Sequence, residues 1–380
     1  MTAVWRARTR RRWVQWTLSG LLALVLAVAF SITTLGFTSA GERIARRLHH
    51  LSTPGLSHIS RLLKDRLAAV PLGEDLRRKG YNECNTYDVL GLGPYSPYER
   101  VYKGRIAIPQ SGGHTADYGY DVLVHFHGHT AVMKTLSQVA RGITYVGIDL
   151  GLGSGAYSDA FPTRAHANKL LVSITRALQR HANDPRAHIR HLALSAWSAG
   201  YGGVNELLKY ISEDVDAVVL LDGLHAAWSP VSGRRGTLDA VAAGPIQPTL
   251  DYAKQALEGD KVFIFTHSTI NPVTYPSTTL TALFLEHQLG LVSVNTPPSR
   301  DRYGLTATVD RGGLHIWSYA GNDKQAHCSH IAHIEHVVRD FLEPTWDTPP
   351  MARDVPPTPA PNLGHSSQLA RQGSDRKNAG

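Results

Sequence analysis

Two uninterrupted apolar runs most limit what this chain can fold into. Residues Val218–Leu221 (VVLL) and Val262–Phe265 (VFIF) lack the alternation of apolar and polar residues that is typical of a strand with one solvent-exposed face. Strands of this kind are covered on both faces, as in a parallel sheet flanked by helices. Longer helical stretches separate the β-rich runs, as such a sheet requires. The sequence therefore predicts an α/β fold with a mostly parallel central sheet and helices on both faces.

The same patterns place the individual elements. We expect strands at Val101–Ile108, Tyr120–Phe126, Ile143–Asp149, Ile189–Ser195, Val215–Leu221, Lys261–Thr266 and Leu314–Tyr319. We expect helices at Met133–Ala140, Thr163–His181, Ala199–Ile211, Pro248–Leu257 and His330–Leu342. Residues 81–345 would form one domain, preceded by a basic helical linker at 41–80. The Pro-rich, polar composition of residues 346–380 predicts a disordered tail.

The first 40 residues have the composition of a targeting segment. Five arginines between Arg6 and Arg12 precede an uncharged stretch, Trp13–Ala40, whose centre at Leu21–Phe30 is almost wholly apolar. About 20 apolar residues can cross a bilayer, and the preceding positive charge would keep the N-terminus in the cytoplasm. We expect a membrane anchor with an extracytoplasmic domain, or a signal sequence removed near Thr38-Ser39-Ala40.

The arginines near the N-terminus also account for much of the net charge of +8. A nucleic-acid binder needs basic residues gathered on a folded face with stacking aromatics nearby, and the sequence shows no such stripe. We therefore expect no nucleic-acid partner. The two cysteines, Cys84 and Cys328, could pair in an oxidising compartment or remain buried free thiols.

A turn after the strand that ends near Ser195 contains the candidate nucleophile. It reads Ala196-Trp197-Ser198-Ala199-Gly200 and leads into a helix. A serine on a strand-to-helix turn points its hydroxyl out of the sheet, and small neighbours let the chain turn sharply. Ala196 stands where such nucleophile elbows have glycine. From Val101 to Leu342 the chain resembles the α/β-hydrolase superfamily, which implies the chain order serine, acid, histidine.

The resemblance implies an acid at the end of a strand after the elbow. Asp222 closes the VVLL run, whereas no carboxylate directly follows the next strand, so Asp222 is the candidate. Asp251 and Asp323 are poorer candidates, and a turn-capping role for Asp222 with Gly223 is the alternative. The base is expected after the last strand, where we choose His327 and keep His330 as the alternative. His333 and His336 continue at helical spacing.

The resemblance also implies an oxyanion hole, a pair of N–H groups that binds the negative oxygen of the reaction intermediate. The expected donors are the amides of Gly128, after the strand at Tyr120–Phe126, and Ala199. We expect substrate contacts from His127, Trp197 and His225. The loops Leu224–Pro245, with Trp228, and Pro272–Gly313, with Tyr275, Phe284 and Leu285, are candidates to shape the pocket, and Gly151–Gly155 is expected to be a flexible loop beside its mouth.

Alternating histidines offer a rival interpretation. His125 and His127 share a face of a strand and could both reach one metal ion, with His129 nearby. The favoured hypothesis is a serine hydrolase that needs no cofactor and cleaves an ester or amide in a small-molecule or polymer substrate. The alternatives are a metallohydrolase that uses His125 and His127, or a non-catalytic, envelope-anchored binding protein.

Overall fold

The computed structural model describes residues 91–354, except 232–233, 260, 273 and 298–302. The predicted anchor, the linker, Cys84 and most of the predicted tail lie outside the described residues. Of the helices within the described ranges, none combines the length and the apolar character needed to cross a membrane. The anchor and the extracytoplasmic location therefore stay predictions.

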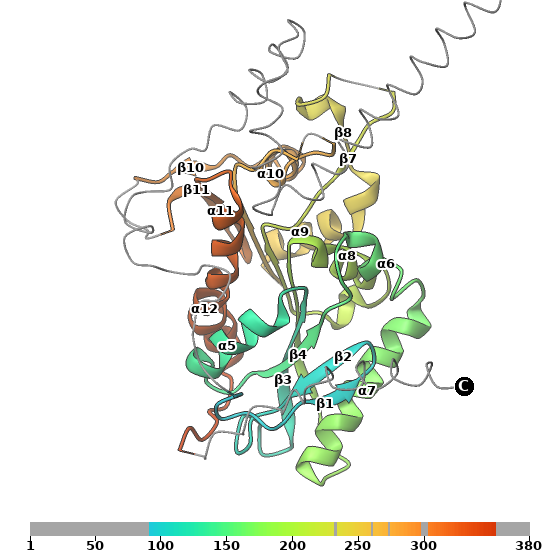
Figure 1. Cartoon of the computed structure of the whole chain (residues 1–380), viewed down its shortest axis with the longest axis vertical. Helices are drawn as coiled ribbons and strands as arrows, with labels where there is room; N and C mark the ends of the chain where they lie inside the picture. Colours follow the sequence, from blue (N-terminus) through green and yellow to red (C-terminus); the bar gives the residue numbers. More distant parts are fainter. Residues whose placement is uncertain (1–90, 232–233, 260, 273, 298–302, 355–380) are drawn as a thin grey trace, which may run out of the picture. The chain divides into compact units, whose positions relative to one another are not determined.

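A ten-stranded sheet runs through the described part of the chain, in the order β1-β2-β4-β3-β5-β6-β9-β12-β11-β10 (Figure 1). Its strands are β1 (Glu99–Val101), β2 (Gly104–Ala107), β3 (Gly119–Phe126), β4 (Thr144–Ile148), β5 (His188–Trp197), β6 (Ala217–Leu221), β9 (Val262–His267), β10 (Val294–Asn295), β11 (Leu305–Arg311) and β12 (Leu314–Tyr319). The six strands from β4 to β12 in this order are mutually parallel. The antiparallel strands β1, β2, β11 and β10 form its two edges. A small separate ribbon pairs β7 (Ala227–Trp228) with β8 (Val241–Ala242).

Helices cover both faces of this sheet. They are α5 (His129–Val139), α6 (Ser154–Ser158), α7 (Arg164–Ala182), α8 (Tyr201–Ile211), α9 (Gln247–Glu258), α10 (Thr278–Leu289), α11 (Lys324–Ser329), α12 (His333–His336) and α13 (Glu343–Trp346). Figure 1 shows α5 and α12 on one side of the sheet and α7 and α8 on the other. Along β3, Val122 and Val124 join the core beneath α7 and α8, whereas Leu123 joins the core beneath α5. The predicted α/β fold, a mostly parallel sheet covered by helices on both faces, is confirmed.

Two segments differ from the prediction. The strand expected at Val101–Ile108 is a hairpin, because Lys103 adopts a positive φ of 62° and reverses the chain between β1 and β2. The segment Pro272–Gly313, in which no helix or strand was predicted, contains α10, β10 and β11. The periodicity of α10 was hidden because its apolar residues are not confined to one face.

Asp121 links the start of the parallel sheet to the end of the domain. Its fully buried carboxylate accepts hydrogen bonds from Arg190 at 2.8 and 2.6 Å, from His191 at 2.9 Å and from Thr348 at 2.7 Å. Since Arg190 also donates to the backbone carbonyl of Trp346 at 2.8 Å, the guanidinium joins β5 to α13.

We expect Asp121→Asn to lower the free energy of unfolding by about 3 kcal/mol, because it leaves buried donors and a cation without their counter-charge. Chemical denaturation would measure the change. Asp184→Asn is the control, since Asp184 pairs with Arg186 at the exposed surface and should contribute little. Equal effects of the two substitutions would contradict the role given to Asp121.

Candidate active site

Ser198 lies at the sharp turn between β5 and the short helix η1 (Ser198–Gly200), which continues into α8. Its φ of 51° is in the left-handed region, which residues with a side chain adopt only when their surroundings enforce it. The turn fits because Gly200 brings its Cα against β3, where an added Cβ would lie 2.2 Å from the carbonyl oxygen of Phe126. The predicted strand–turn–helix context of Ser198 is present.

Asp222 follows β6 directly and is buried, with 2% of its surface exposed. Three groups hold its carboxylate: the Ser268 amide donates at 2.9 Å, the Ser268 hydroxyl at 2.7 Å and the Thr278 hydroxyl at 2.7 Å. Burial alone would raise the pKa of Asp222. The neighbouring His330 and His327 and these hydrogen bonds lower it more, so the pKa lies well below its ordinary value. The carboxylate is therefore ionised at neutral pH.

His327 lies in α11, and its side chain is 24% exposed. Its Nδ1 is 2.7 Å from Oδ2 of Asp222. Because the ionised carboxylate can only accept, Nδ1 carries the proton and Nε2 is left with its lone pair in the neutral ring. Among the described residues, neither Nε2 of His327 nor the Ser198 hydroxyl has a hydrogen-bond partner, and the two are not hydrogen-bonded to each other.

Two further contacts bring Ser198 to this pair. Gly223, next to Asp222, packs so closely on the turn that an added Cβ would lie 2.3 Å from the Ser198 carbonyl oxygen. The ring of Trp197 contacts the His327 ring in a tilted arrangement at a centroid distance of 4.8 Å, and its Nε1 donates to the His327 carbonyl at 3.0 Å. The predicted serine, acid and base thus converge at the carboxyl edge of the sheet.

The turn between β3 and α5 lies beside Ser198. His127 and Gly128 both have positive φ values, 70° and 74°. An added Cβ on Gly128 would lie 3.0 Å from the Trp197 ring, so the turn packs directly on the residue before Ser198. Within the described ranges, the amides of Gly128 and Ala199 donate to no backbone carbonyl, which leaves both available to a ligand.

The three predicted substrate residues are partly engaged in the protein. His127 stacks on Trp197 at a centroid distance of 5.1 Å, and its Nδ1 lies 2.8 Å from the Tyr157 hydroxyl. The Trp197 ring therefore contacts two histidines, His127 and His327. His225 donates to the Pro276 carbonyl at 2.9 Å, and burial lowers its pKa. Each remains half-buried at the site, so contact with a substrate stays a prediction.

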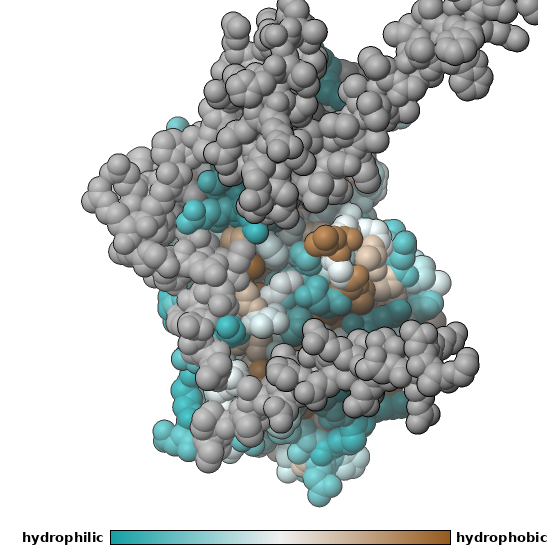
Figure 2. All heavy atoms as spheres, in the orientation of Figure 1, coloured by the Kyte–Doolittle hydropathy of each residue, from teal (hydrophilic) through white to brown (hydrophobic). Residues whose placement is uncertain are grey.

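Two segments that were predicted to lie near the site carry exposed apolar side chains. Leu152 is 91% exposed and Tyr275 is 44% exposed. Figure 2 shows hydrophobic atoms gathered beside α6 and α8. The predicted flexible loop Gly151–Gly155 leads into α6, which begins at Ser154 and packs on α8, since a Cβ on Gly202 would lie 2.3 Å from the Ser154 carbonyl oxygen.

His330, the alternative base, is fully buried behind Asp222, with its Nδ1 2.7 Å from the Thr266 hydroxyl. Burial lowers its pKa to about 4. His330 has no exposed surface from which to meet a substrate, so the geometry favours His327. His333 is buried as well, and His336 lies at the surface.

The histidines of β3 do not share a ligand site. In His125, Nδ1 is 2.9 Å from the Ser195 hydroxyl and Nε2 is 2.7 Å from the His127 carbonyl, so both ring nitrogens are occupied. Within residues 91–354, outside the gaps, no cluster of three His, Cys, Asp or Glu side chains could hold a metal ion. The geometry gives the metallohydrolase interpretation no support.

Several residues at the site were not predicted from the sequence. Ser268 and Thr278 hold Asp222, and Tyr157 and Asp149 hold His127. The only signal for these residues in the sequence was that hydroxyl residues, Ser268 and Thr269, directly follow β9 and no carboxylate does. Cys328, next to His327, is disulfide-bonded, while Cys84 lies outside the described residues.

Comparison with known proteins gives only distant structural likenesses. No protein-family model matches the chain, and no curated protein matches it either. Similar solved structures include a ferric enterobactin esterase from Salmonella typhimurium, with 14% identity and a TM-score of 0.41 over 68% of this chain and 61% of that one. Another is a feruloyl esterase module from Clostridium thermocellum, with 7% identity and a TM-score of 0.38 over 68% and 90%.

A poly(3-hydroxybutyrate) depolymerase from Bordetella parapertussis is similar at 14% identity and a TM-score of 0.38, over 63% of this chain and 84% of that one. This chain thus spans about three fifths of the length of the enterobactin esterase. At these identities and TM-scores, the function proposed below rests on the chain's own side chains.

We expect Gly223→Ala to lower the free energy of unfolding by about 2 kcal/mol, because the new Cβ displaces the backbone of the turn at Ser198. Denaturation curves would measure the loss. Gly155→Ala is the matched control, because its added Cβ would meet no atom within 4 Å. Unchanged stability in Gly223→Ala would show that the close approach is not a constraint.

The buried histidines predict a loss of stability in acid. Burial lowers the pKa of His267 and His330 from 6.5 to about 4, so the unfolded chain binds these protons first as the pH falls. The free energy of unfolding should therefore decrease from about pH 6.5 to about pH 4. His330→Gln should reduce this slope, whereas His336→Gln, at a half-exposed side chain, should not. A slope unchanged by His330→Gln would contradict the assignment.

Proposed function

We propose that this chain is a serine hydrolase that cleaves an ester or amide bond, with Ser198 as nucleophile, His327 as base and Asp222 as the orienting acid. The observation that carries the proposal is the Asp222–His327 hydrogen bond beside a serine held at a positive φ. A buried, ionised carboxylate is costly unless it is paired, and here it is paired with a ring that faces the turn. No cofactor is needed for this chemistry.

In the first step, Nε2 of His327 accepts the proton of the Ser198 hydroxyl while Oγ attacks the substrate carbonyl carbon. The carbonyl π electrons move to oxygen, and the amides of Gly128 and Ala199 donate to the resulting oxyanion. Donors of this kind each contribute about 3 kcal/mol to transition-state stabilisation. Asp222 fixes the ring tautomer and stabilises the imidazolium.

In the second half of the step, the oxyanion collapses and the bond to the leaving group breaks. The imidazolium of His327 gives its proton to the leaving group, at the oxygen of an alcohol or the nitrogen of an amine. Ser198 is then acylated. Water attacks the acyl carbon while His327 accepts its proton. His327 then returns this proton to Oγ of Ser198 as the acyl–oxygen bond breaks, which releases the acid and restores the serine.

A fluorophosphonate probe would test the proposal, because it reacts only with an activated serine. We expect labelling of the wild type and none of Ser198→Ala, whereas the control Ser195→Ala, three residues earlier in β5, should still react. An unlabelled, folded wild type would reject the serine-hydrolase proposal and favour a binding role.

The acid can be tested separately. We expect Asp222→Asn to lower kcat by about four orders of magnitude with little change in KM, because the amide no longer holds the productive tautomer of His327. His330→Gln should leave kcat within a few-fold. A larger effect at His330 than at Asp222 and His327 would contradict the assignment of the base.

A further inference from the structure

His125 is a buried polar side chain that the mechanism above does not use. It lies near the end of β3, has no exposed surface and pairs with Ser195 of β5 in the sheet. A buried ring nitrogen is costly unless it has a hydrogen-bond partner. Both nitrogens have one, since Nδ1 lies 2.9 Å from the Ser195 hydroxyl and Nε2 lies 2.7 Å from the His127 carbonyl oxygen.

The carbonyl determines where the ring of His125 carries its proton. A carbonyl oxygen can only accept, so Nε2 carries the proton and donates to His127. Nδ1 then has the lone pair and accepts from the Ser195 hydroxyl. Burial lowers the pKa of His125 to about 3, so the ring is neutral near pH 7 and keeps this tautomer.

The carbonyl that accepts from His125 belongs to the same peptide group as the Gly128 amide. The described residues contain no cis peptide bond. In a trans peptide the C=O and the N–H point in opposite directions. Because the carbonyl points at the buried ring, the Gly128 N–H points away from it. This N–H is one of the two proposed oxyanion donors.

The turn between β3 and α5 is strained and is held at several points. His127 has a φ of 70°, which a residue with a side chain adopts only where its surroundings enforce it. The His127 amide donates to the Ile148 carbonyl at 2.9 Å, and the Gly128 carbonyl accepts from the Ala131 amide at 3.2 Å. The peptide group between these two anchors is held by the His125 ring.

We propose that His125 is a positioning residue for oxyanion binding: its Nε2–H fixes the plane of the His127–Gly128 peptide, so that the Gly128 amide faces the oxyanion formed at Ser198. This inference rests on the proposed function. His125 acts through the peptide group, since both its ring nitrogens are occupied within the protein. The oxyanion exists only after attack, so loss of His125 should slow the reaction without weakening substrate binding.

Three substitutions in the full chain separate the hydrogen bond of His125 from its bulk. His125→Leu removes both polar contacts. His125→Asn puts an amide near the position of Nδ1, too short to reach the His127 carbonyl, whereas His125→Gln puts one near the position of Nε2, where it can donate. With p-nitrophenyl acetate, we expect kcat to fall about tenfold to a hundredfold in the Leu and Asn variants, with KM little changed. His125→Gln should recover most of the loss.

Inhibition by phenyl trifluoromethyl ketone gives a readout that a purely structural role would not change. Oγ of Ser198 adds to the ketone carbon, its proton passes to His327, and the ketone oxygen becomes an oxyanion held by the same donors. Its Ki should therefore rise in the Leu and Asn variants by about the factor by which kcat falls. Partial unfolding would lower the apparent kcat and leave Ki unchanged, because the remaining folded molecules bind normally. That outcome would overturn the positioning role.

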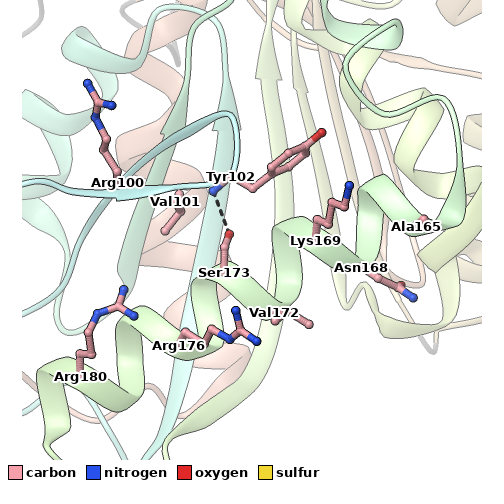
Figure 3. Close-up of a pocket in the computed structure, with 10 residues that line it drawn as sticks. All are labelled: Arg100, Val101, Tyr102, Ala165, Asn168, Lys169, Val172, Ser173, Arg176 and Arg180. Carbon is pink, nitrogen blue, oxygen red and sulfur yellow. Dashed lines mark hydrogen bonds between the residues drawn. The ribbon is translucent and has the colours of Figure 1, made fainter.

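Two control variants remove similar hydrogen bonds at α7, where no residue of the site lies. His181→Leu removes a ring that donates to the Pro109 carbonyl at 3.0 Å. Ser173→Ala removes the hydroxyl that accepts from the Tyr102 amide at 2.9 Å (Figure 3). Both should keep the wild-type kcat and Ki. Losses equal to those of His125→Leu would overturn the proposal.

The Asn and Gln variants decide the question if His125→Leu does not fold. Equal losses in these two variants, unchanged kcat in both, or a raised KM with unchanged kcat would overturn the positioning role. Ser195→Ala keeps the donor at Nε2, so it should lose less activity than His125→Asn and still react with the fluorophosphonate probe. An unlabelled wild type would reject the proposed function, whereas a labelled wild type with unaffected His125 variants would reject this inference alone.

Discussion

The candidate site depends on the close approach of two backbones, where β6 ends and where β5 turns. Gly223 allows this approach because any side chain would overlap the Ser198 carbonyl. Parallel neighbouring strands end at the same edge of a sheet, so a serine after β5 and an aspartate after β6 are brought together by the topology itself. The left-handed φ values of Ser198 and Asp222 turn both side chains away from the strands at that edge.

Electrostatics then determine what this edge can do. The carboxylate of Asp222 is buried, yet hydrogen bonds from Ser268, Thr278 and His327 replace the water it has lost. The nearby rings of His267 and His330 stay neutral because burial opposes their protonation. The ring of His327, which is hydrogen-bonded to this carboxylate, keeps access to solvent, with 24% of its side chain exposed.

Much of this arrangement could be predicted from local sequence signals. The buried strands, the elbow at Ser198 and the position of Asp222 at a strand end all follow from residues that are close in the chain. The hydroxyls that hold Asp222 could not be predicted, because Thr278 begins a helix whose apolar residues show no periodicity. The choice between His327 and His330 as the base also required the three-dimensional structure, because the two histidines lie in adjacent helical turns and differ in how deeply they are buried.

Trp197 contacts the rings of both His127 and His327 and therefore links the turn at Ser198 with the turn after β3 and with the proposed base. Residues in mutual contact do not change independently, because the energy of each substitution depends on the others. During divergence, these three positions should consequently evolve as one unit: a smaller ring at 197 would be tolerated only with compensating changes on both sides. Relatives that keep these three ring contacts should therefore vary first in their outer loops, and only later at positions 127, 197 and 327.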